Sequence, residues 1–516
     1  MWFFRKTSPR RSWVRKNISV ERFSRLKWLT DTNSLISAFL WLLFVVLCIP
    51  ILSYKRALVP TAVIVVLISL AAAFYIYNFQ GRLLKNHARA SVLAGLFILL
   101  LAATKVGVLL PDHRTFWATA TAVATAIILI ISYNQRFAMD MSLFYCLFAY
   151  IAAGPVPSGK YQLTGMNLIL TMIAAVYTCC FSLKEIRTRM KLLKVSALSA
   201  FMVFITAVSV SYVNFSAESP QTADIFSNAG YHAGAAFLMG MLIQSLLPLI
   251  EKIFRIATSM TLLDYSDANQ PLLKRLAMEA PGTFSHSLLI GSVSEAAAEA
   301  IGRNGLLCRV GAYYHDIGKI NKPAYFVENE MGSASRHKEL SPAMSHLIII
   351  GHVKDGIEMT KEYGLPSVLR QFIETHHGTT LVEHFYNEAK KQKTQNSKGK
   401  AGDAPSESEF RYPGPKPRTK EAAIVMLADT IEGAVRSLPE VTPARIDAVV
   451  HNMVMKRLQD GQFDECEISL RELSQIETSI SKTLAIHYHG RIAYPKAPDV
   501  PDSMQSQPQQ TEQRND

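Results

Sequence analysis

The chain has 516 residues, of which 49% are hydrophobic and 18% charged, and its formal net charge is +13. This length allows more than one domain, and the charge alone would fit a nucleic-acid partner. Residues 1–33 hold nine Lys or Arg and two acids, and residues 184–194 hold five bases and one acid. Because these bases adjoin apolar segments, we interpret them as determinants of membrane topology and exclude a nucleic-acid polymer as partner. Six cysteines without paired spacing predict neither disulfides nor a cysteine metal site.

Eight apolar segments follow the basic tail formed by residues 1–33, and they predict a transmembrane domain over residues 34–250. Most are long enough to cross a lipid bilayer, whereas the fourth and fifth are short and separated only by residues 134–136. The segments are residues 34–54, 59–79, 91–110, 116–133, 137–154, 166–183, 196–213 and 230–250.

The loops between these segments predict the orientation of the chain. Basic residues gather at 82–89, at 184–194 and at 252–255, whereas the alternate loops, apart from residues 55–56, carry fewer bases. Cytoplasmic loops of membrane proteins are enriched in Lys and Arg. An even number of spans therefore puts both ends of the chain in the cytoplasm.

From residue 251 onward the composition is that of an all-helical domain, so the predicted fold class is all-α throughout. We expect a connecting helix over 251–279 and a domain over 280–495, with a flexible insertion at 390–420 and a disordered tail at 496–516. The helices expected in the domain are residues 285–301, 306–314, 342–363, a helix opened by Pro366 that ends near His376, 443–459 and 469–488.

The stretch Tyr313–Lys319 contains an adjacent His315-Asp316 pair at the end of an apolar helix. Adjacent helix positions point about 100° apart, so the pair can approach two neighbouring metal ions, with Asp316 bridging them. Ligation by His and carboxylate without Cys favours Mn, Fe or Co. The candidate metal ligands are His286, His315, Asp316, His352, His376, His377 and Asp429.

Two divalent ions bridged by Asp316 would have a spacing suited to metal-assisted phosphoryl hydrolysis. We therefore name Asp316 as a catalytic residue. Lys319 is a second catalytic candidate because its ammonium could neutralise a phosphate, although a solvated lysine at a helix end is an equal alternative. Asp429 follows the apolar residues 424–428, where a metal ion would compensate its charge.

The His…His-Asp…Asp pattern resembles the HD phosphohydrolase superfamily, and His315–Gly318 is similar to its HDIG form. The chain most closely resembles the membrane-bound 7TM-HD proteins, the PgpH-type cyclic di-AMP phosphodiesterases. This resemblance implies one metal on His286, His315, Asp316 and Asp429, and a second on Asp316, His352, His376 and His377. It also implies hydrolysis of cyclic di-AMP to pApA by two divalent ions, Mn or Fe, at the bacterial inner membrane with the HD domain in the cytoplasm. The stretches that carry it include 286–288, 314–319, 323–329, 340–342, 376–379 and 414–417.

In one respect the sequence departs from this family, whose members carry a large extracellular domain between the first two spans. Here only about five residues, 55–59, separate them. A signal would then have to reach the membrane spans or the cytoplasmic surface. A homodimer formed through the connecting helix is a further expectation.

Three other functions stay open. An HD-GYP enzyme would hydrolyse cyclic di-GMP with a similar metal set, but no Gly-Tyr-Pro motif follows Gly378. A one-metal phosphohydrolase of nucleotides or alarmones would not need His352, His376 and His377. A receptor or transport protein could use the soluble domain only to bind a nucleotide, and the complete ligand set argues against such a degenerate site.

Overall fold

A computed structural model describes residues 32–53, 57–80, 83, 86–109, 115–154, 163, 165–183, 188–213, 222–330, 336–396 and 405–489. These residues contain helices and a single isolated bridge between Leu381 and Arg411, so the all-α prediction is confirmed for the described part. The chain divides into a membrane unit, residues 1–267 with 364–368, and a second unit that holds the remaining residues. The predicted tails at 1–33 and 496–516 lie almost entirely outside the described residues.

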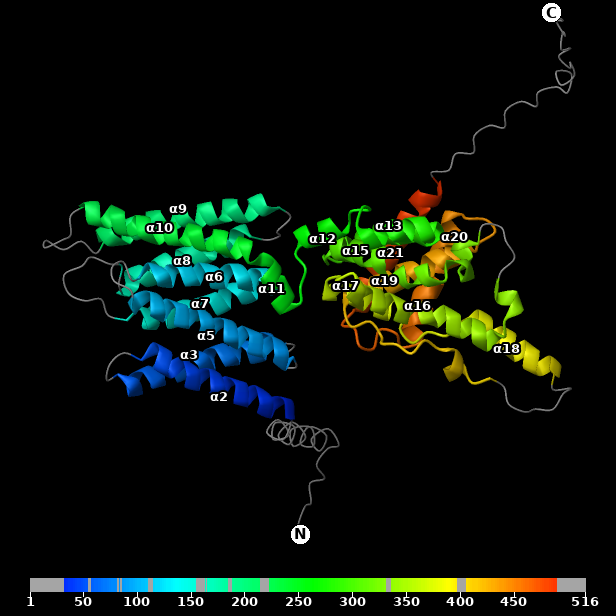
Figure 1. Cartoon of the computed structure of the whole chain (residues 1–516), viewed down its shortest axis with the longest axis horizontal. Coiled ribbons are helices and arrows are strands. Elements are labelled where there is room, and N and C mark those ends of the chain that lie inside the picture. Colours follow the sequence, from blue (N-terminus) through cyan, green and yellow to red (C-terminus); the bar gives the residue numbers. More distant parts are fainter. Residues whose placement is uncertain are drawn as a thin grey trace, which may run out of the picture. The chain divides into compact units, whose positions relative to one another are not determined.

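All eight predicted apolar segments form helices in the membrane unit (Figure 1). Six are long and apolar enough to span a membrane, and α10 with α11 makes a seventh, bent by 63°. The remaining expected span, the fourth in chain order, is α6, which has only 17 residues. The helices are α2 (Thr32–Leu52), α3 (Leu58–Phe79), α5 (His87–Leu109), α6 (Phe116–Ser132), α7 (Gln135–Ala153), α8 (Gly165–Ser182), α9 (Arg189–Val213), α10 (Thr222–Ser245) and α11 (Leu247–Phe254).

Helix α6 is the most buried helix of this unit. Its burial explains why it can be shorter than the other apolar helices. Twelve of its 17 residues are buried, and it packs against α5, α7, α8 and α10. Its Ala and Thr side chains let neighbouring backbones approach closely, and Thr121 and Thr125 donate hydrogen bonds to carbonyls of their own helix. A helix enclosed by other helices does not need the full length that contact with lipid requires.

The expected connecting helix over 251–279 is wrong, because the chain breaks twice in this stretch. Helix α11 ends at Arg255, whose φ of 53° is left-handed. Thr258 then caps α12 (Ser259–Tyr265), and Pro271 opens α13 (Pro271–Glu279). A Thr cap and a Pro in the first turn both favour a new helix start, so the breaks follow from local sequence.

The second unit is built around α19 (Lys420–Arg436), whose residues Ala422–Ala428 are all buried. Helices α14 (Pro281–Ala300), α15 (Gly305–Tyr314), α20 (Pro443–Gln459) and α21 (Leu470–His489) contribute to the same hydrophobic core. The central position of α19 carries Asp429, directly after the buried run, to the middle of the unit. The remaining α-helices are α16 (Pro342–Glu362), α17 (Ser367–Thr375) and α18 (Glu383–Asn396).

The segment expected to be a flexible insertion, 390–420, is folded over most of its described part. It contains the end of α18 and the short 3-10 helix η5 (Glu407–Phe410). Beyond η5, Arg411, Lys416 and Arg418 form ion pairs with Asp460, Asp464 and Glu465 at 3.0, 3.1 and 2.7 Å. The Pro-, Gly- and charge-rich composition suggested flexibility, but its charges have partners that follow α20.

Candidate metal site

The structure brings all seven predicted metal ligands together. Their donor atoms form two groups that share Asp316, and within each group the atoms lie within 4.8 Å of one another. The ligands come from α14, from the end of α15, from α16, from the residues after α17 and from α19. The first group contains His286, His315, Asp316 and Asp429, and the second contains Asp316, His352, His376 and His377.

Asp316 divides its two carboxylate oxygens between the groups. Oδ2 lies 3.1 Å from His315 Nε2 and 3.9 Å from His286 Nε2. Oδ1 lies 3.4 Å from His352 Nε2 and 3.5 Å from His376 Nε2. This is the arrangement expected of a carboxylate that bridges two metal ions.

Asp429 completes the first group and approaches the second. Its Oδ1 lies 3.0 Å from His286 Nε2 and 3.6 Å from His315 Nε2. Its Oδ2 lies 3.9 Å from His377 Nδ1. Both carboxylates therefore face imidazole nitrogens from two sides, although the two residues are far apart in sequence.

Three histidines are held in a fixed tautomer by the backbone. The Nδ1 atoms of His315, His352 and His376 each donate to a carbonyl three residues earlier, at 2.6, 2.5 and 3.0 Å. A proton on Nδ1 leaves the lone pair on Nε2, which is the atom that points into the cluster. The pattern orients all three rings for metal binding.

Several donor atoms in the cluster lack the partners that a metal-free site would need. Asp316 Oδ1 is buried without a hydrogen bond, and His315 Nε2 faces only the carboxylates of Asp316 and Asp429. His352 Nε2 and His376 Nε2 lie 3.1 Å apart, yet both are lone-pair atoms when Nδ1 carries the proton. Buried polar atoms are normally satisfied, and a cation between them would satisfy all of these. The residues therefore fit a pair of metal ions.

Glu432 supports the first group and was missed by sequence reasoning. Its Oε2 accepts a hydrogen bond from His286 Nδ1 at 2.8 Å, and Arg436 pairs with the same carboxylate. Carboxylates that hold a ligating imidazole in this way fix its tautomer and raise its basicity. The signal was available, since Glu432 lies three residues after Asp429 on the same helix, with Arg436 one turn further.

Lys319 does not point freely toward a substrate. Its Nζ lies 2.8 Å from Asp316 Oδ2 and 2.7 Å from Glu328 Oε1. Burial opposes its charge, but Asp316 and Glu328 outweigh burial and raise the pKa of the ammonium. We therefore interpret Lys319 as a residue that positions the bridging carboxylate, whereas a contact with phosphate stays a prediction.

The segment after η5 reaches the second group. The ring of Tyr412 stacks on His377, with ring centres 4.2 Å apart and planes inclined by 25°. Backbone hydrogen bonds from Tyr412 to Thr380 and from Val382 to Phe410 fix this approach. No sequence spacing predicts a role for Tyr412, because its contact joins a loop to the residues after a helix.

The two groups differ in the electrostatics of their imidazoles. Burial lowers the pKa of His315, but Asp316 and Asp429 outweigh burial and raise it to about 10. Burial lowers the pKa of His352 to about 3, and His376 and Lys319 reinforce this. The difference arises because the first group has two carboxylates close to two imidazoles, whereas in the second, three imidazoles compete for fewer carboxylate oxygens.

Fold and site together define a multi-pass membrane protein that carries an all-helical HD domain. Residues 283–434 match the family model of the HD domain, and residues 56–258 match the family described as "7TM receptor with intracellular HD hydrolase". Two parts of the chain therefore match the membrane HD family that the sequence predicted. The suspected resemblance is confirmed at the level of the family, and helix α2 lies outside the matched region.

Two relatives share the name "Cyclic-di-AMP phosphodiesterase PgpH". The Bacillus subtilis protein is 35% identical over 444 residues, which are 85% of this chain and 60% of the relative. The Listeria monocytogenes protein is 42% identical over 264 residues, 51% of this chain and 35% of the relative. The chain thus spans less than two thirds of the length of these relatives.

Solved structures of a related HD domain are also similar to part of this chain. The crystal structure of the L. monocytogenes phosphodiesterase PgpH HD domain is 43% identical and has a TM-score of 0.40. It covers 43% of this chain and all of that one. The same domain in complex with cyclic-di-AMP gives the same values.

Proposed function

We propose that this protein is a membrane-anchored phosphodiesterase that hydrolyses cyclic di-AMP to pApA with two metal ions. The observation that carries the proposal is Asp316, whose oxygens are divided between two complete groups of ligands. A one-metal phosphohydrolase would not need the second group. The substrate is proposed from the relatives named as cyclic-di-AMP phosphodiesterases.

The residues present would hold one ion on His286, His315, Asp316 and Asp429, and one on Asp316, His352, His376 and His377. When bound, such a pair supplies charge neutralisation at the phosphodiester and an activated water. Asp316 orients both halves of the site, Glu432 holds His286, and Lys319 holds Asp316. Burial of the ligands in the helical core keeps these orientations fixed.

The metals proposed are Mn or Fe, because the donor set contains only imidazole and carboxylate. The basic N-terminal tail and basic loops support a cytoplasmic position for the HD domain at the bacterial inner membrane. A homodimer is a further possibility for assembly. Because 251–279 is not one helix, the predicted route to that dimer loses its support.

The full chain, purified in detergent micelles, would be incubated with Mn²⁺ and either cyclic di-AMP or cyclic di-GMP. We expect cyclic di-AMP to yield pApA and the reaction to stop with a chelator. A His352→Ala variant should lose activity, whereas His384→Ala should not, because His384 is an exposed residue of α18 outside both groups.

Preference for cyclic di-GMP would replace the proposed substrate with that of the HD-GYP class. Binding of cyclic di-AMP without cleavage by the metal-loaded protein would instead support a receptor role. Metal content, measured on the same samples, separates either outcome from simple loss of metal. The matched His384→Ala protein controls for the handling of a membrane protein.

A further inference from the structure

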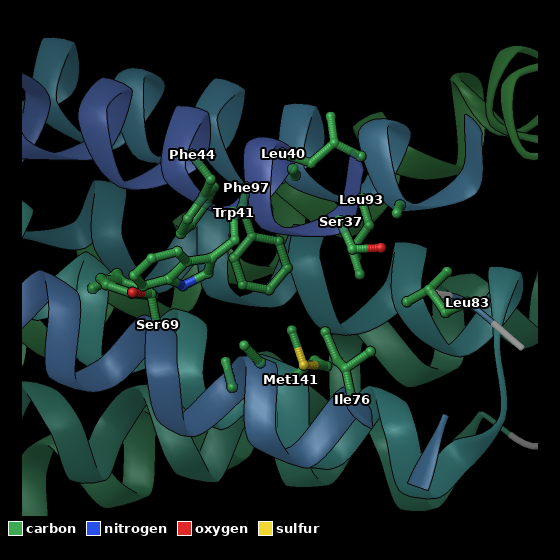
Figure 2. Close-up of a pocket in the computed structure, with 15 residues that line it drawn as sticks. Ser37, Leu40, Trp41, Phe44, Ser69, Ile76, Leu83, Leu93, Phe97 and Met141 are labelled. Carbon is green, nitrogen blue, oxygen red and sulfur yellow. The ribbon is translucent and has the colours of Figure 1, made fainter. Parts of the chain in front are cut away.

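A partly open cavity of about 150 Å³ lies between α2, α3, α5 and α7 of the membrane unit (Figure 2). Its wall is largely apolar and includes four aromatic side chains, Trp41, Phe44, Phe97 and Phe148. Residues Ser37 and Ser69 supply the few hydroxyl groups. Enclosed apolar cavities of about this volume are known to bind benzene-sized molecules, and this pocket has a similar volume and lining but is partly open.

One polar group in this wall has no partner. The indole N–H of Trp41 is buried and makes no hydrogen bond with any described residue. Trp41 lies near the middle of α2, about 15 Å from either end of a helix of this length, so interfacial water is distant. A buried donor left unsatisfied is costly, and Trp N–H groups usually find a partner when buried.

Ser69 lies on the facing helix α3 and does not satisfy the indole. Its hydroxyl donates to the carbonyl of Val66 at 3.0 Å. In Figure 2 the Trp41 ring and the Ser69 side chain both border the open space. The cavity therefore combines an aromatic wall with one vacant hydrogen-bond donor.

The cavity also lies at the boundary between α2 and the helices of the matched family region. Helices α3, α5 and α7 fall within the matched family region, residues 56–258, whereas α2 precedes it. Only three residues of α2, Val45, Cys48 and Leu52, are buried. Because α2 is held by so few buried side chains, an occupant of the cavity would add substantially to its packing against the other helices.

We propose that this cavity is a binding site for a bilayer-soluble apolar molecule of about benzene size that carries one carbonyl-type oxygen. The apolar body fills the space between the aromatic side chains, and the oxygen accepts the hydrogen bond of the Trp41 indole. A saturated acyl tail would fill the volume but would leave the N–H unpaired. The site joins α2 to α3, α5 and α7, which lie within the matched family region.

The test compares two probes that differ in the carbonyl group, 4-fluoroacetophenone and 1-ethyl-4-fluorobenzene. Their binding to the full chain in micelles would be measured by ¹⁹F NMR titration of wild type and of Trp41→Phe. We expect Trp41→Phe to weaken the carbonyl probe about fivefold, the effect of losing one ordinary hydrogen bond, and to leave the hydrocarbon probe unchanged. Each probe partitions into the micelles equally with wild type and with Trp41→Phe, so this contribution cancels when the two proteins are compared.

A second pair of variants tests the place of binding. Ala72→Leu would fill the cavity that Ala72 lines, whereas Ala71→Leu adds the same group on the exposed side of α3. Binding of both probes should be lost in Ala72→Leu and kept in Ala71→Leu. If Ala72→Leu fails to fold, the Trp41→Phe comparison decides alone. Equal losses of both probes in Trp41→Phe, or binding that survives in folded Ala72→Leu, would overturn the proposal.

Discussion

Gly318 lies directly against the backbone of His352. A Cβ atom at Gly318 would lie 1.9 Å from the His352 carbonyl oxygen and 2.5 Å from the Gly356 nitrogen. Because Gly318 has no side chain, the backbone after Asp316 can pack directly against the backbone of α16. This contact brings the two halves of the metal site to one place.

Gly318→Ala should separate these halves. We expect a loss of at least about 1–3 kcal/mol in stability, since overpacking of a close contact costs this much, together with a lower metal content. The control is Gly351→Ala, which lies next to His352 on α16 and meets nothing within 4 Å. Thermal melting and metal analysis would check both variants, and an unaltered Gly318→Ala protein would contradict the interpretation.

Glu432→Gln should weaken the first metal group. The carboxylate that accepts from His286 Nδ1 would be replaced by a neutral amide, so His286 becomes a poorer ligand. Substitutions of such supporting groups cost about 10–100-fold in metal affinity or activity. Metal titration followed by activity would measure this. Glu440→Gln, at an exposed carboxylate, serves as the control and should behave like wild type.

Lys319→Gln distinguishes the two roles considered for this lysine. If Lys319 positions Asp316, the variant should bind metal about 10–100-fold more weakly, and excess Mn²⁺ should restore kcat. If the ammonium instead contacts a phosphate, KM should rise and excess metal should not correct it. Steady-state kinetics at several Mn²⁺ concentrations would show which pattern holds.

Metal binding should depend on pH more steeply in the first group than in the second. The raised pKa of His315, about 10, means that this imidazole holds a proton at neutral pH that the metal must displace. Between pH 6 and 8, each unit of falling pH should therefore weaken binding there about tenfold. His352, with its pKa lowered to about 3, is already neutral in this range and releases no proton.

Calorimetric titration of the metal-free full chain with Mn²⁺ would measure this, in two buffers of different ionisation enthalpy. We expect one class of sites to release protons and the other to release fewer. Equal proton release from both classes would show that the carboxylates of the first group do not hold a charged imidazole. Asp316→Asn replaces the carboxylate that both groups share with a neutral amide, and it should lower the affinity of each group for metal.

The two breaks between α11 and α13 are encoded in the local sequence. Thr258 and Pro271 are ordinary helix-start residues, yet the apolar leucines nearby favoured one continuous helix. The reverse holds for 405–420, where a composition typical of disorder is ordered, and Arg411, Lys416 and Arg418 form ion pairs with acidic residues. Those partners lie some 45–50 residues further along the chain, as with Arg411 and Asp460.

The all-helical class, the run of apolar helices and the seven His and Asp residues of the cluster were all predictable from the sequence alone. These depend on local periodicity and on residue types whose chemistry is evident without a fold. Three features emerged only from the packing of the helices: Asp316 divides its oxygens between two groups, Glu432 and Tyr412 contact His286 and His377, and a cavity borders Trp41. Each depends on helices that are distant in sequence but pack together, and no local pattern encodes such contacts.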